Sequence, residues 1–229
     1  MNSPEPTIIL ANKITAKNST LLIPTFADTP LTGIKNFVDA DTLRLIEADY
    51  QNRAGETKLV YASRRVILFG LGKKAQLNLG AWRRAVQTAV LTARTTGSEV
   101  LELIVPNFSK PEFLEMAAFA AQFACYDFLI YKHDQKPKHL KKIIIVGKST
   151  TTSRAAVNRG LALAYAANTA RDLANHPANV ATPTHLANHA KQMGRQFGFK
   201  VKVLNREQIK KIKLIFGKFI MPVTFAPHF

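Results

Sequence analysis

The sequence predicts an α/β fold in which helices cover both faces of a sheet. Short apolar segments rich in β-branched residues alternate along the chain with longer segments whose apolar residues recur at helical spacing. The segment 65–69 is apolar at every position after its arginine, as expected for a strand that is covered on both faces. Alternation of this kind is typical of chains whose strands are connected by helices that pack on the sheet.

The strands are expected in the short apolar segments, because β-branched and aromatic residues favour extended backbone. A tight connection at Ser63-Arg64 joins two of them into a hairpin. The predicted strands are residues 7–10, 19–24, 58–62, 65–69, 99–105 and 142–146, with a further strand at 199–204.

The helices are expected where apolar residues recur every three or four positions behind a residue that can cap a helix. The candidate caps are Asp39 or Asp41, the cluster 150–153, Thr182 and Asn205. The predicted helices end near residues 48, 95, 123, 174 and 197, and a short one follows Asn205. Their expected core residues are Leu43, Ile46 and Leu45; Trp82, Val86, Ala89 and Val90; and Phe113, Met116, Ala120 and Phe123.

Composition places the chain among globular proteins of the cytoplasm. A length of 229 residues allows one large domain, or one domain and a fragment, and 47% of the residues are hydrophobic. No apolar run is long enough to span a bilayer, and the first twenty residues lack the pattern of a secretory signal. The single cysteine, Cys125, excludes an internal disulfide and is expected to be a small core residue.

Charge is distributed unevenly along the chain. The net charge is +17, and residues 135–229 hold 17 lysines and arginines but only two acidic residues, Asp172 and Glu207. Clustered cations of this kind attract the phosphates of nucleic acids. Loss of an acidic partner domain would leave the same imbalance, so both explanations stay open.

Residues 168–183, which read N-T-A-R-D-L-A-N-H-P-A-N-V-A-T-P, form a joint between two helices. Pro177 ends the first helix, Thr182 is placed to cap the second, and Pro183 occupies its first turn. Arg171 and Asp172 are neighbours on a helix and point in different directions, so each needs its own partner. They are either a charged pair on a solvated face or part of a buried polar hinge.

This joint resembles the interdomain signature of the cytosolic leucyl aminopeptidases, the dimetal peptidase family M17. Residues 66–73 and 126–132 resemble segments of that family's N-terminal domain, and the whole resemblance runs from about residue 7 to 211. The residues that carry the signature are expected to be structural. They are Asn168, Arg171, Asp172, Leu173, Asn175, Pro177, Asn179, Thr182 and Pro183.

The resemblance implies how the chain is divided. Residues 1–150 are expected to form a macro-domain-like unit, a three-layer mixed sheet with helices on both faces. Residues 151–176 are expected to form an interdomain linker helix. Residues 177–229 would be the truncated beginning of the peptidase domain, with an atypical tail from about residue 212. A truncated or frame-shifted reading frame would explain that tail.

The function that the resemblance implies is metal-dependent removal of N-terminal residues from peptides by a cytoplasmic homo-oligomer, a hexamer in the family. The intact protein would use two divalent cations, manganese or zinc. Because a dimetal site needs several carboxylates and only Asp172 and Glu207 follow residue 135, no catalytic or metal-binding residue can be assigned. The chain is therefore expected to be inactive alone. The alternative is a basic module that binds nucleic acid or drives oligomerisation.

Three further groups have a functional and a purely structural interpretation. His185 and His189, spaced i, i+4, could bind zinc with His176, or they could be ordinary exposed histidines. The turn 70–74, Gly-Leu-Gly-Lys-Lys, could cradle a phosphate, although a tight strand-to-helix turn explains it better. The remaining group could grip a nucleic-acid backbone or form a solvated loop: Tyr131, Lys136, Lys138, His139, Lys141 and Lys142.

Overall fold

The computed structural model describes residues 5–15, 18–106, 110–132 and 140–211. The chain forms two compact units, Met1–Asn175 and His176–Phe229. The first unit holds the whole sheet and most of the helices, and the second begins with the helix α5. No described helix combines the length and the hydropathy that a membrane span requires.

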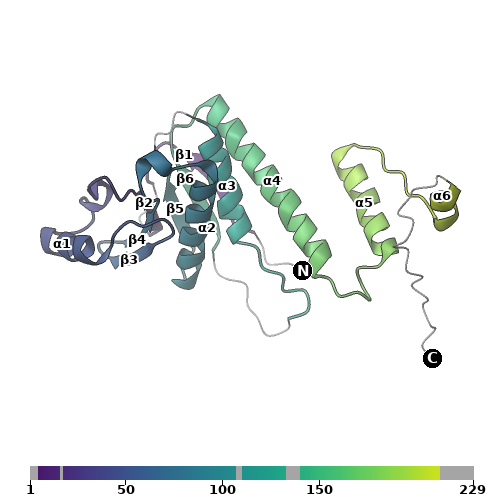
Figure 1. The fold of residues 1–229 in the computed structure, drawn as a ribbon, viewed down its shortest axis with the longest axis horizontal. Helices are drawn as coiled ribbons and strands as arrows, with labels where there is room; N and C mark the ends of the chain where they lie inside the picture. The colour runs from purple at the N-terminus through teal and green to yellow at the C-terminus, as the bar shows by residue number, and fades with distance from the viewer. Residues whose placement is uncertain (1–4, 16–17, 107–109, 133–139, 212–229) are drawn as a thin grey trace. The chain divides into compact units, whose positions relative to one another are not determined.

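The first unit is built on one mixed sheet with the strand order β1-β6-β5-β2-β4-β3 (Figure 1). Neighbouring strands run parallel, except that β3 pairs with β4 in an antiparallel hairpin. The strands are β1 (Thr7–Ala11), β2 (Thr20–Thr25), β3 (Thr57–Tyr61), β4 (Arg65–Gly70), β5 (Val100–Ile104) and β6 (Lys142–Val146). The predicted α/β class is therefore confirmed.

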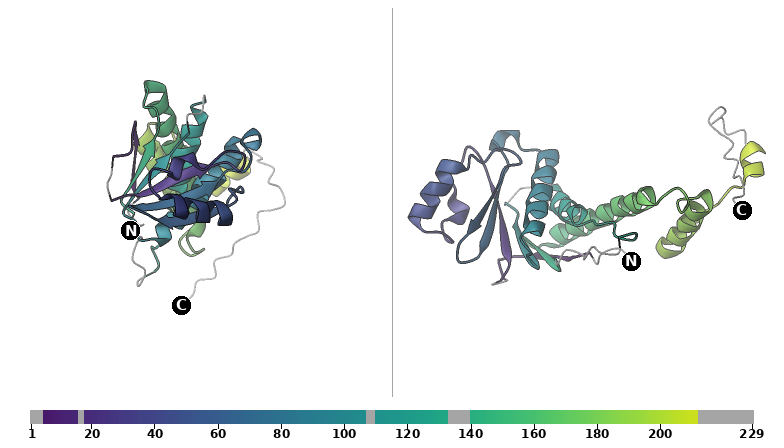
Figure 2. Two further views of the ribbon diagram at one scale, coloured as in Figure 1. Left: turned by 90° about the vertical axis from the view of Figure 1, so that its left-hand side faces the viewer. Right: turned by 90° about the horizontal axis from the view of Figure 1, so that it is seen from below.

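Helices lie on both faces of this sheet, which makes three layers. In Figure 2 the sheet separates α1 from the layer formed by α2 and α3. Caps begin the helices where the sequence predicts them: Asp39 accepts from the amide of Thr42 at 2.7 Å, and the Thr150 hydroxyl accepts from the amide of Ser153 at 3.1 Å. The helices are η1 (Thr32–Ile34), α1 (Ala40–Asp49), η2 (Lys74–Gln76), α2 (Leu79–Thr95), α3 (Glu112–Ala124), α4 (Thr151–Asn175), α5 (Pro183–Phe197) and α6 (Arg206–Lys211).

Each face of the sheet has its own apolar cluster. The larger cluster lies under α2 and α3 and centres on Trp82, which is fully buried and whose indole N–H donates to the Phe113 carbonyl at 2.8 Å. The smaller cluster lies under α1 and includes Ile46 and Tyr50. Leu45, which we expected to face this core, is 69% exposed and lies on the wrong side of α1.

The buried face of α3 differs from the predicted stripe. Its fully buried side chains are small ones, whereas Phe113, Met116 and Phe123 are only partly buried. The reason is that α3 lies between α2 and α4 and is covered on more than one side. Small residues let neighbouring helices approach closely. The buried set is Ala117, Ala118, Ala120, Ala121, Gln122 and Ala124.

The predicted strand at 199–204 does not form. Residues 199–205 have no regular secondary structure, and the described part of the second unit contains only the helices α5 and α6. A strand needs the backbone of a neighbouring strand to satisfy its amides and carbonyls. Since the described residues of this unit offer no such neighbour, the β-branched pattern alone was not enough.

The helix α4 packs along α3 and clusters with the first unit, whose boundary falls after Asn175. Its buried stripe crosses α3 at Gly160. A Cβ on Gly160 would lie 2.2 Å from the Glu115 carbonyl oxygen, so only glycine allows this approach. The stripe consists of Ser153, Ala156, Val157, Gly160, Ala164 and Asn168.

Candidate functional site

The residues of the predicted signature that lie on α4 meet the end of α3. We call this arrangement the helix clasp: Asn168, Arg171, Asp172 and Asn175 of α4 with Gln122, Phe123 and Tyr126 at the end of α3, together with Glu5. The signature spacing places these α4 residues on the same side of the helix, in line with its buried stripe.

Arg171 lies between two aromatic rings. Its guanidinium carbon is 4.4 Å from the ring centroid of Phe123 and 3.9 Å from that of Tyr126. The same guanidinium donates to the Phe123 carbonyl at 3.2 Å and to the Asn168 side-chain oxygen at 3.4 Å. Stacking on two rings stabilises the cation through the negative ring faces and buries its apolar plane. Arg171 therefore holds α4 against the end of α3.

Asp172 and Asn175 contact the same tyrosine from the other side of the clasp. The Tyr126 hydroxyl donates to the Asp172 carboxylate at 2.8 Å and accepts from the Asn175 amide at 3.0 Å. Burial, with the Asp172 carboxylate as a further cause, raises the pKa of Tyr126. Arg171 and Asp172 therefore share Tyr126 as a partner, through its ring and its hydroxyl, where we expected a separate partner for each. Both residues are half-buried, and these contacts lie within the first unit.

Asn168 connects the clasp to the beginning of the chain. It is buried, and its side-chain amide donates to the Glu5 carboxylate at 3.1 Å. The other oxygen of that carboxylate accepts from the Gln122 amide. A polar group this deeply buried is costly unless it is hydrogen-bonded. Glu5 therefore stabilises both helices, and nothing in the local sequence around it indicated that role.

The rest of the signature shapes the connection between α4 and α5. Pro177 follows the end of α4, and its carbonyl accepts from the amides of Val180 and Ala181 at 2.8 and 2.9 Å. The Thr182 hydroxyl caps α5 by accepting from the His185 amide at 3.2 Å, and Pro183 is the first residue of that helix. Leu173 is half-buried on α4, and Asn179 is exposed in the turn.

The backbone amides of the Gly70–Gly72 turn are hydrogen-bonded to carbonyls of this chain. The amides of Gly70, Leu71 and Gly72 donate to the carbonyls of Glu56, Thr25 and Asn52, at 2.8, 2.8 and 3.1 Å. The amide of Lys74 donates to the carboxylate of Asp28, an acidic neighbour that disfavours phosphate. A Cβ on Gly70 would lie 2.0 Å from the Arg53 carbonyl oxygen. The glycines thus serve a tight turn.

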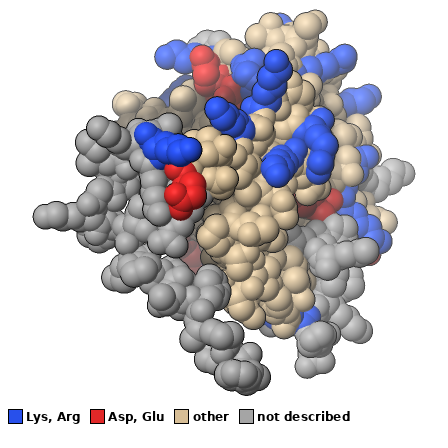
Figure 3. Space-filling model, turned by 90° about the vertical axis from the view of Figure 1, so that its right-hand side faces the viewer, with Lys and Arg blue, Asp and Glu red and all other residues tan. Residues whose placement is uncertain are grey.

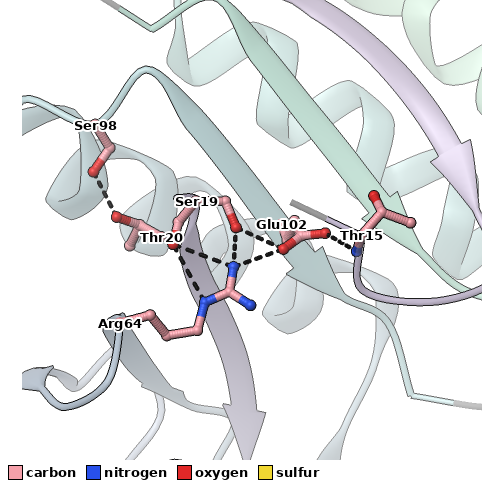
Figure 4. A network of polar contacts seen from close by, with 6 residues as sticks. All are labelled: Thr15, Ser19, Thr20, Arg64, Ser98 and Glu102. Carbon is pink, nitrogen blue, oxygen red and sulfur yellow. Dashed lines mark hydrogen bonds and ion pairs between the residues drawn. The ribbon is translucent and has the colours of Figure 1, made fainter. Parts of the chain in front are cut away.

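The sequence did not lead us to predict the buried ion pair between Glu102 and Arg64, which lies on the side of the sheet that α1 covers (Figure 4). Glu102 of β5 is completely buried and accepts from Arg64 at 2.7 Å, from the Ser19 hydroxyl at 2.5 Å and from the Thr15 amide at 2.7 Å. Several donors are what a buried carboxylate needs to remain charged. The available signal was a single glutamate inside an apolar strand. Its partners come from distant loops, so the group ties the start of the sheet to the β3–β4 turn.

A hollow of about 330 Å³ lies at the ends of β5 and β6. Two of its hydroxyl groups lie at the start of α4. The hydroxyls of Thr150 and Ser153 are hydrogen-bonded at 2.9 Å, and the Thr150 hydroxyl caps the helix. Its lysines, Lys110 and Lys148, are exposed. The lining also includes Val105, Pro106, Pro111, Phe113, Leu114, Gly147 and Thr152. Helix capping therefore explains why the hydroxyl groups of Thr150 and Ser153 lie in this hollow.

Comparison with known sequences decides the family. The profile of the cytosol aminopeptidase family, N-terminal domain, matches residues 46–135, and the profile of the family's catalytic domain matches residues 168–219. A probable cytosol aminopeptidase of Ralstonia pickettii is 30% identical over 227 residues, which cover 89% of this chain and 45% of that protein. The chain belongs to the cytosol aminopeptidase family.

Other relatives agree on the extent of the match. A probable cytosol aminopeptidase of Acidobacterium capsulatum is 31% identical over 184 residues, covering 74% of this chain and 36% of that protein. The chain thus spans less than half the length of these relatives. The catalytic-domain match begins at Asn168, in the clasp, and continues to residue 219, beyond Lys211, where we expected the resemblance to stop.

Solved structures share the fold. A mutant of tomato leucine aminopeptidase superposes with a TM-score of 0.75 at 19% identity, covering 92% of this chain and 47% of that one. The bottromycin maturation enzyme BotP in complex with Mn superposes with a TM-score of 0.68 at 21% identity, covering 86% and 40%. The two matches support the α/β architecture described above.

The carboxylates of the basic half do not fit a dimetal site. Asp172 accepts a hydrogen bond from the Tyr126 hydroxyl within the clasp, and Glu207 lies exposed on α6. In the described ranges, no three His, Cys, Asp or Glu side chains gather in a way that could hold a metal ion. Two divalent cations need several oxygen ligands at close quarters. No step of a metal-dependent reaction can therefore be assigned to these residues.

The other candidate residues are only partly brought together. The rings of His176 and His185 meet edge to face with centroids 5.2 Å apart, whereas His189 lies a turn further along α5. Lys141 forms an exposed ion pair with Glu99 at 2.9 Å, and Tyr131 is 47% exposed. Lys136, Lys138 and His139 lie outside the described residues.

Proposed function

We propose that this chain is the N-terminal part of a metal-dependent aminopeptidase. It would contribute a macro-like layered domain, the clasped helix α4 and the first elements of the peptidase domain. The observation that carries the proposal is that the catalytic-domain match begins within the clasp. The complete protein would remove N-terminal residues from peptides in the cytoplasm, as a hexamer that uses two divalent cations, manganese or zinc.

The role of this chain within such a protein would be structural. The clasp would hold α4 against α3 within the first unit, and Thr182 and Pro183 would begin α5, the first helix of the region that matches the peptidase domain. The chain by itself would not hydrolyse peptides, because its basic half supplies only Asp172 and Glu207 as carboxylate ligands. Positioning and assembly are thus the functions proposed for these residues.

An activity assay tests this proposal. The purified chain is incubated with leucyl p-nitroanilide and a leucyl dipeptide in the presence of manganese, zinc or magnesium. The full-length relative from Ralstonia pickettii, treated identically, serves as the positive control. We expect no turnover above a mock-purified sample. Hydrolysis that needs the metal and stops on chelation would refute the claim that this chain lacks a catalytic site.

Binding of nucleic acid is the second candidate, and the charge distribution favours it. On the face drawn in Figure 3, described lysines and arginines clearly outnumber described carboxylates. Lys200 and Lys202 are both exposed in the second unit. If the surface binds phosphates, gel retardation of duplex DNA should weaken steeply between about 50 and 200 mM salt. Lys200→Glu with Lys202→Glu should reduce it, and Lys58→Glu on β3 should not. Failure to retard DNA at the lower salt concentration would reject this candidate.

A further inference from the structure

The two edges of the sheet are protected unequally. The edge strand β3 carries Lys58, which pairs with Asp49 at 3.2 Å. The edge strand β1 reads Thr-Ile-Ile-Leu-Ala and contains neither a charge nor a proline. Charged residues and proline are the usual means by which proteins prevent an edge strand from pairing with another chain. The β1 edge lacks both.

The hydrogen-bond pattern shows which groups of β1 face outward. The Thr7 amide donates to the Lys141 carbonyl at 3.0 Å, and the Ala11 carbonyl accepts from the Gly147 amide at 2.9 Å. In a parallel ladder the bonding residues of one strand alternate. Thr7, Ile9 and Ala11 therefore bond to β6, and the amides and carbonyls of Ile8 and Leu10 point away from it. Within the described ranges, β1 pairs with β6 on one side only.

We propose that β1 is a dimer interface, in which β1 of a second copy pairs with it in antiparallel orientation about a two-fold axis at Ile9. In this register the amide and carbonyl of Ile8 form hydrogen bonds with the carbonyl and amide of the partner's Leu10. By symmetry Leu10 bonds the partner's Ile8, so the outward amides and carbonyls of both residues are all hydrogen-bonded. A second copy fits because it presents the same groups at the same spacing, and because an uncharged strand offers no attraction to a charged peptide.

The side chains are consistent with this register. Ile9 faces its own copy across the axis and is 36% exposed, so pairing would cover an apolar surface that is now partly in water. Ile8 and Leu10 point to the opposite face and pack against the larger cluster of their own sheet. A two-fold interface is complete with two copies, so it covers the β1 edge of both. The edges that remain exposed in the dimer are the β3 strands, which carry Lys58.

The interface is small, so the dimer has to be sought at high protein concentration. One strand pair buries less than the ~1,200 Å² of a standard stable interface, so association is weak and depends on concentration. The contact uses only the first unit and is independent of the proposed aminopeptidase function. Sedimentation equilibrium of the full chain from about 1 to 300 µM, with assembly read as molar mass, covers the range of weak association.

A charge swap at Ile9 tests the register. Residues at such a two-fold position lie only ~5 Å apart at Cβ, so Ile9→Lys or Ile9→Glu alone should weaken dimerisation at least about fivefold through like-charge repulsion. An equimolar mixture of the two variants should dimerise again, because the opposed charges attract. Tyr61→Lys and Tyr61→Glu on the exposed side of β3 are the matched controls and should dimerise as the wild type does.

The outcomes are distinct. Wild-type dimers, weakened by either Ile9 variant and restored by mixing them, support the interface, and the restored mixture also shows that both variants fold. A wild-type chain that remains monomeric over the whole range overturns the proposal. So does an assembly that either Ile9 variant leaves unchanged, or one that the mixture fails to restore, because such an assembly uses another surface.

Discussion

At the residue scale, Arg171 stabilises the clasp through its flat guanidinium group as much as through its charge. Its guanidinium lies between the rings of Phe123 and Tyr126 and donates to a main-chain carbonyl. Arg171→Ala should lower the free energy of unfolding by about 1–3 kcal/mol, since both ring contacts and the packing of the side-chain stem are lost. Arg171→Lys should recover only part of this, because an ammonium does not stack.

Urea unfolding monitored by circular dichroism measures the effect of Arg171. Arg84→Ala is the matched control, since Arg84 lies exposed on α2 and should change stability by less than about 0.5 kcal/mol. If Arg171→Ala unfolds at the same urea concentration as Arg84→Ala, the clasp does not stabilise this chain.

Cys125 provides a second residue-scale prediction, on pH. Burial raises the pKa of its thiol from 9.0 to about 12. Between these values the unfolded chain loses the thiol proton and the folded chain keeps it, so the free energy of unfolding falls as pH rises. The loss from this group should be about 1 kcal/mol between pH 8 and pH 10. Urea titrations at both pH values should show a smaller fall for Cys125→Ala, and an equal fall in both proteins would contradict this.

The sequence was most informative about residues whose role is local. Thr182 and Pro183 were predicted from helix-cap chemistry, and both are where we expected them. A buried Cys125 followed from its position in an apolar helix. The partners of Arg171 and Glu102 were not predictable, because they come from segments distant in the sequence, and one chain without its fold does not reveal which distant residues meet.

At the scale of elements, the crossing of α3 and α4 depends on Gly160. Alanine normally stabilises a helix relative to glycine by ~1 kcal/mol. Here a Cβ would overlap the Glu115 carbonyl, so Gly160→Ala should destabilise the chain by about 1–3 kcal/mol despite its better propensity. Gly80→Ala on α2 is the control, because its Cβ would meet only side-chain atoms, at 3.3 and 3.6 Å.

Thermal melts of the two glycine variants decide the point by sign. Gly160→Ala should melt below the wild type, and Gly80→Ala should melt at or above it. A Gly160→Ala protein that is as stable as the wild type would mean that the two helices can separate without cost, and that α4 is not firmly packed on the first unit.

Elements were predictable where local pattern and tertiary packing agree. The six strands of the sheet and the helices α1, α2, α4 and α5 begin and end within a few residues of their predicted bounds. The buried face of α3 was not predictable from a single apolar stripe, because two helices cover it. The segment 199–204 has strand-like residues without a partner strand, so its propensity alone did not produce a strand.

At the scale of the whole molecule, α4 clusters with the first unit, which ends at Asn175. The predicted division placed residues 1–150 in one domain and treated 151–176 as a linker. The packing of α4 on α3 and the contacts of Asn168, Arg171 and Asp172 instead join the helix to the sheet domain. The part of the signature that lies on α4 thus makes contacts within the first unit, which sequence position alone could not show.

Comparison of two shortened chains tests this claim most directly. One ends at Asn175 and keeps the clasp, and the other ends at Thr150 and lacks α4. Thermal unfolding of each is followed beside the full chain. We predict that the chain ending at Asn175 unfolds cooperatively with nearly the midpoint of the full chain. The chain ending at Thr150 should melt much lower, or without a cooperative transition, because the α3 surface around Ala118 and Phe123 becomes exposed. Equal midpoints for the two shortened chains would contradict the account.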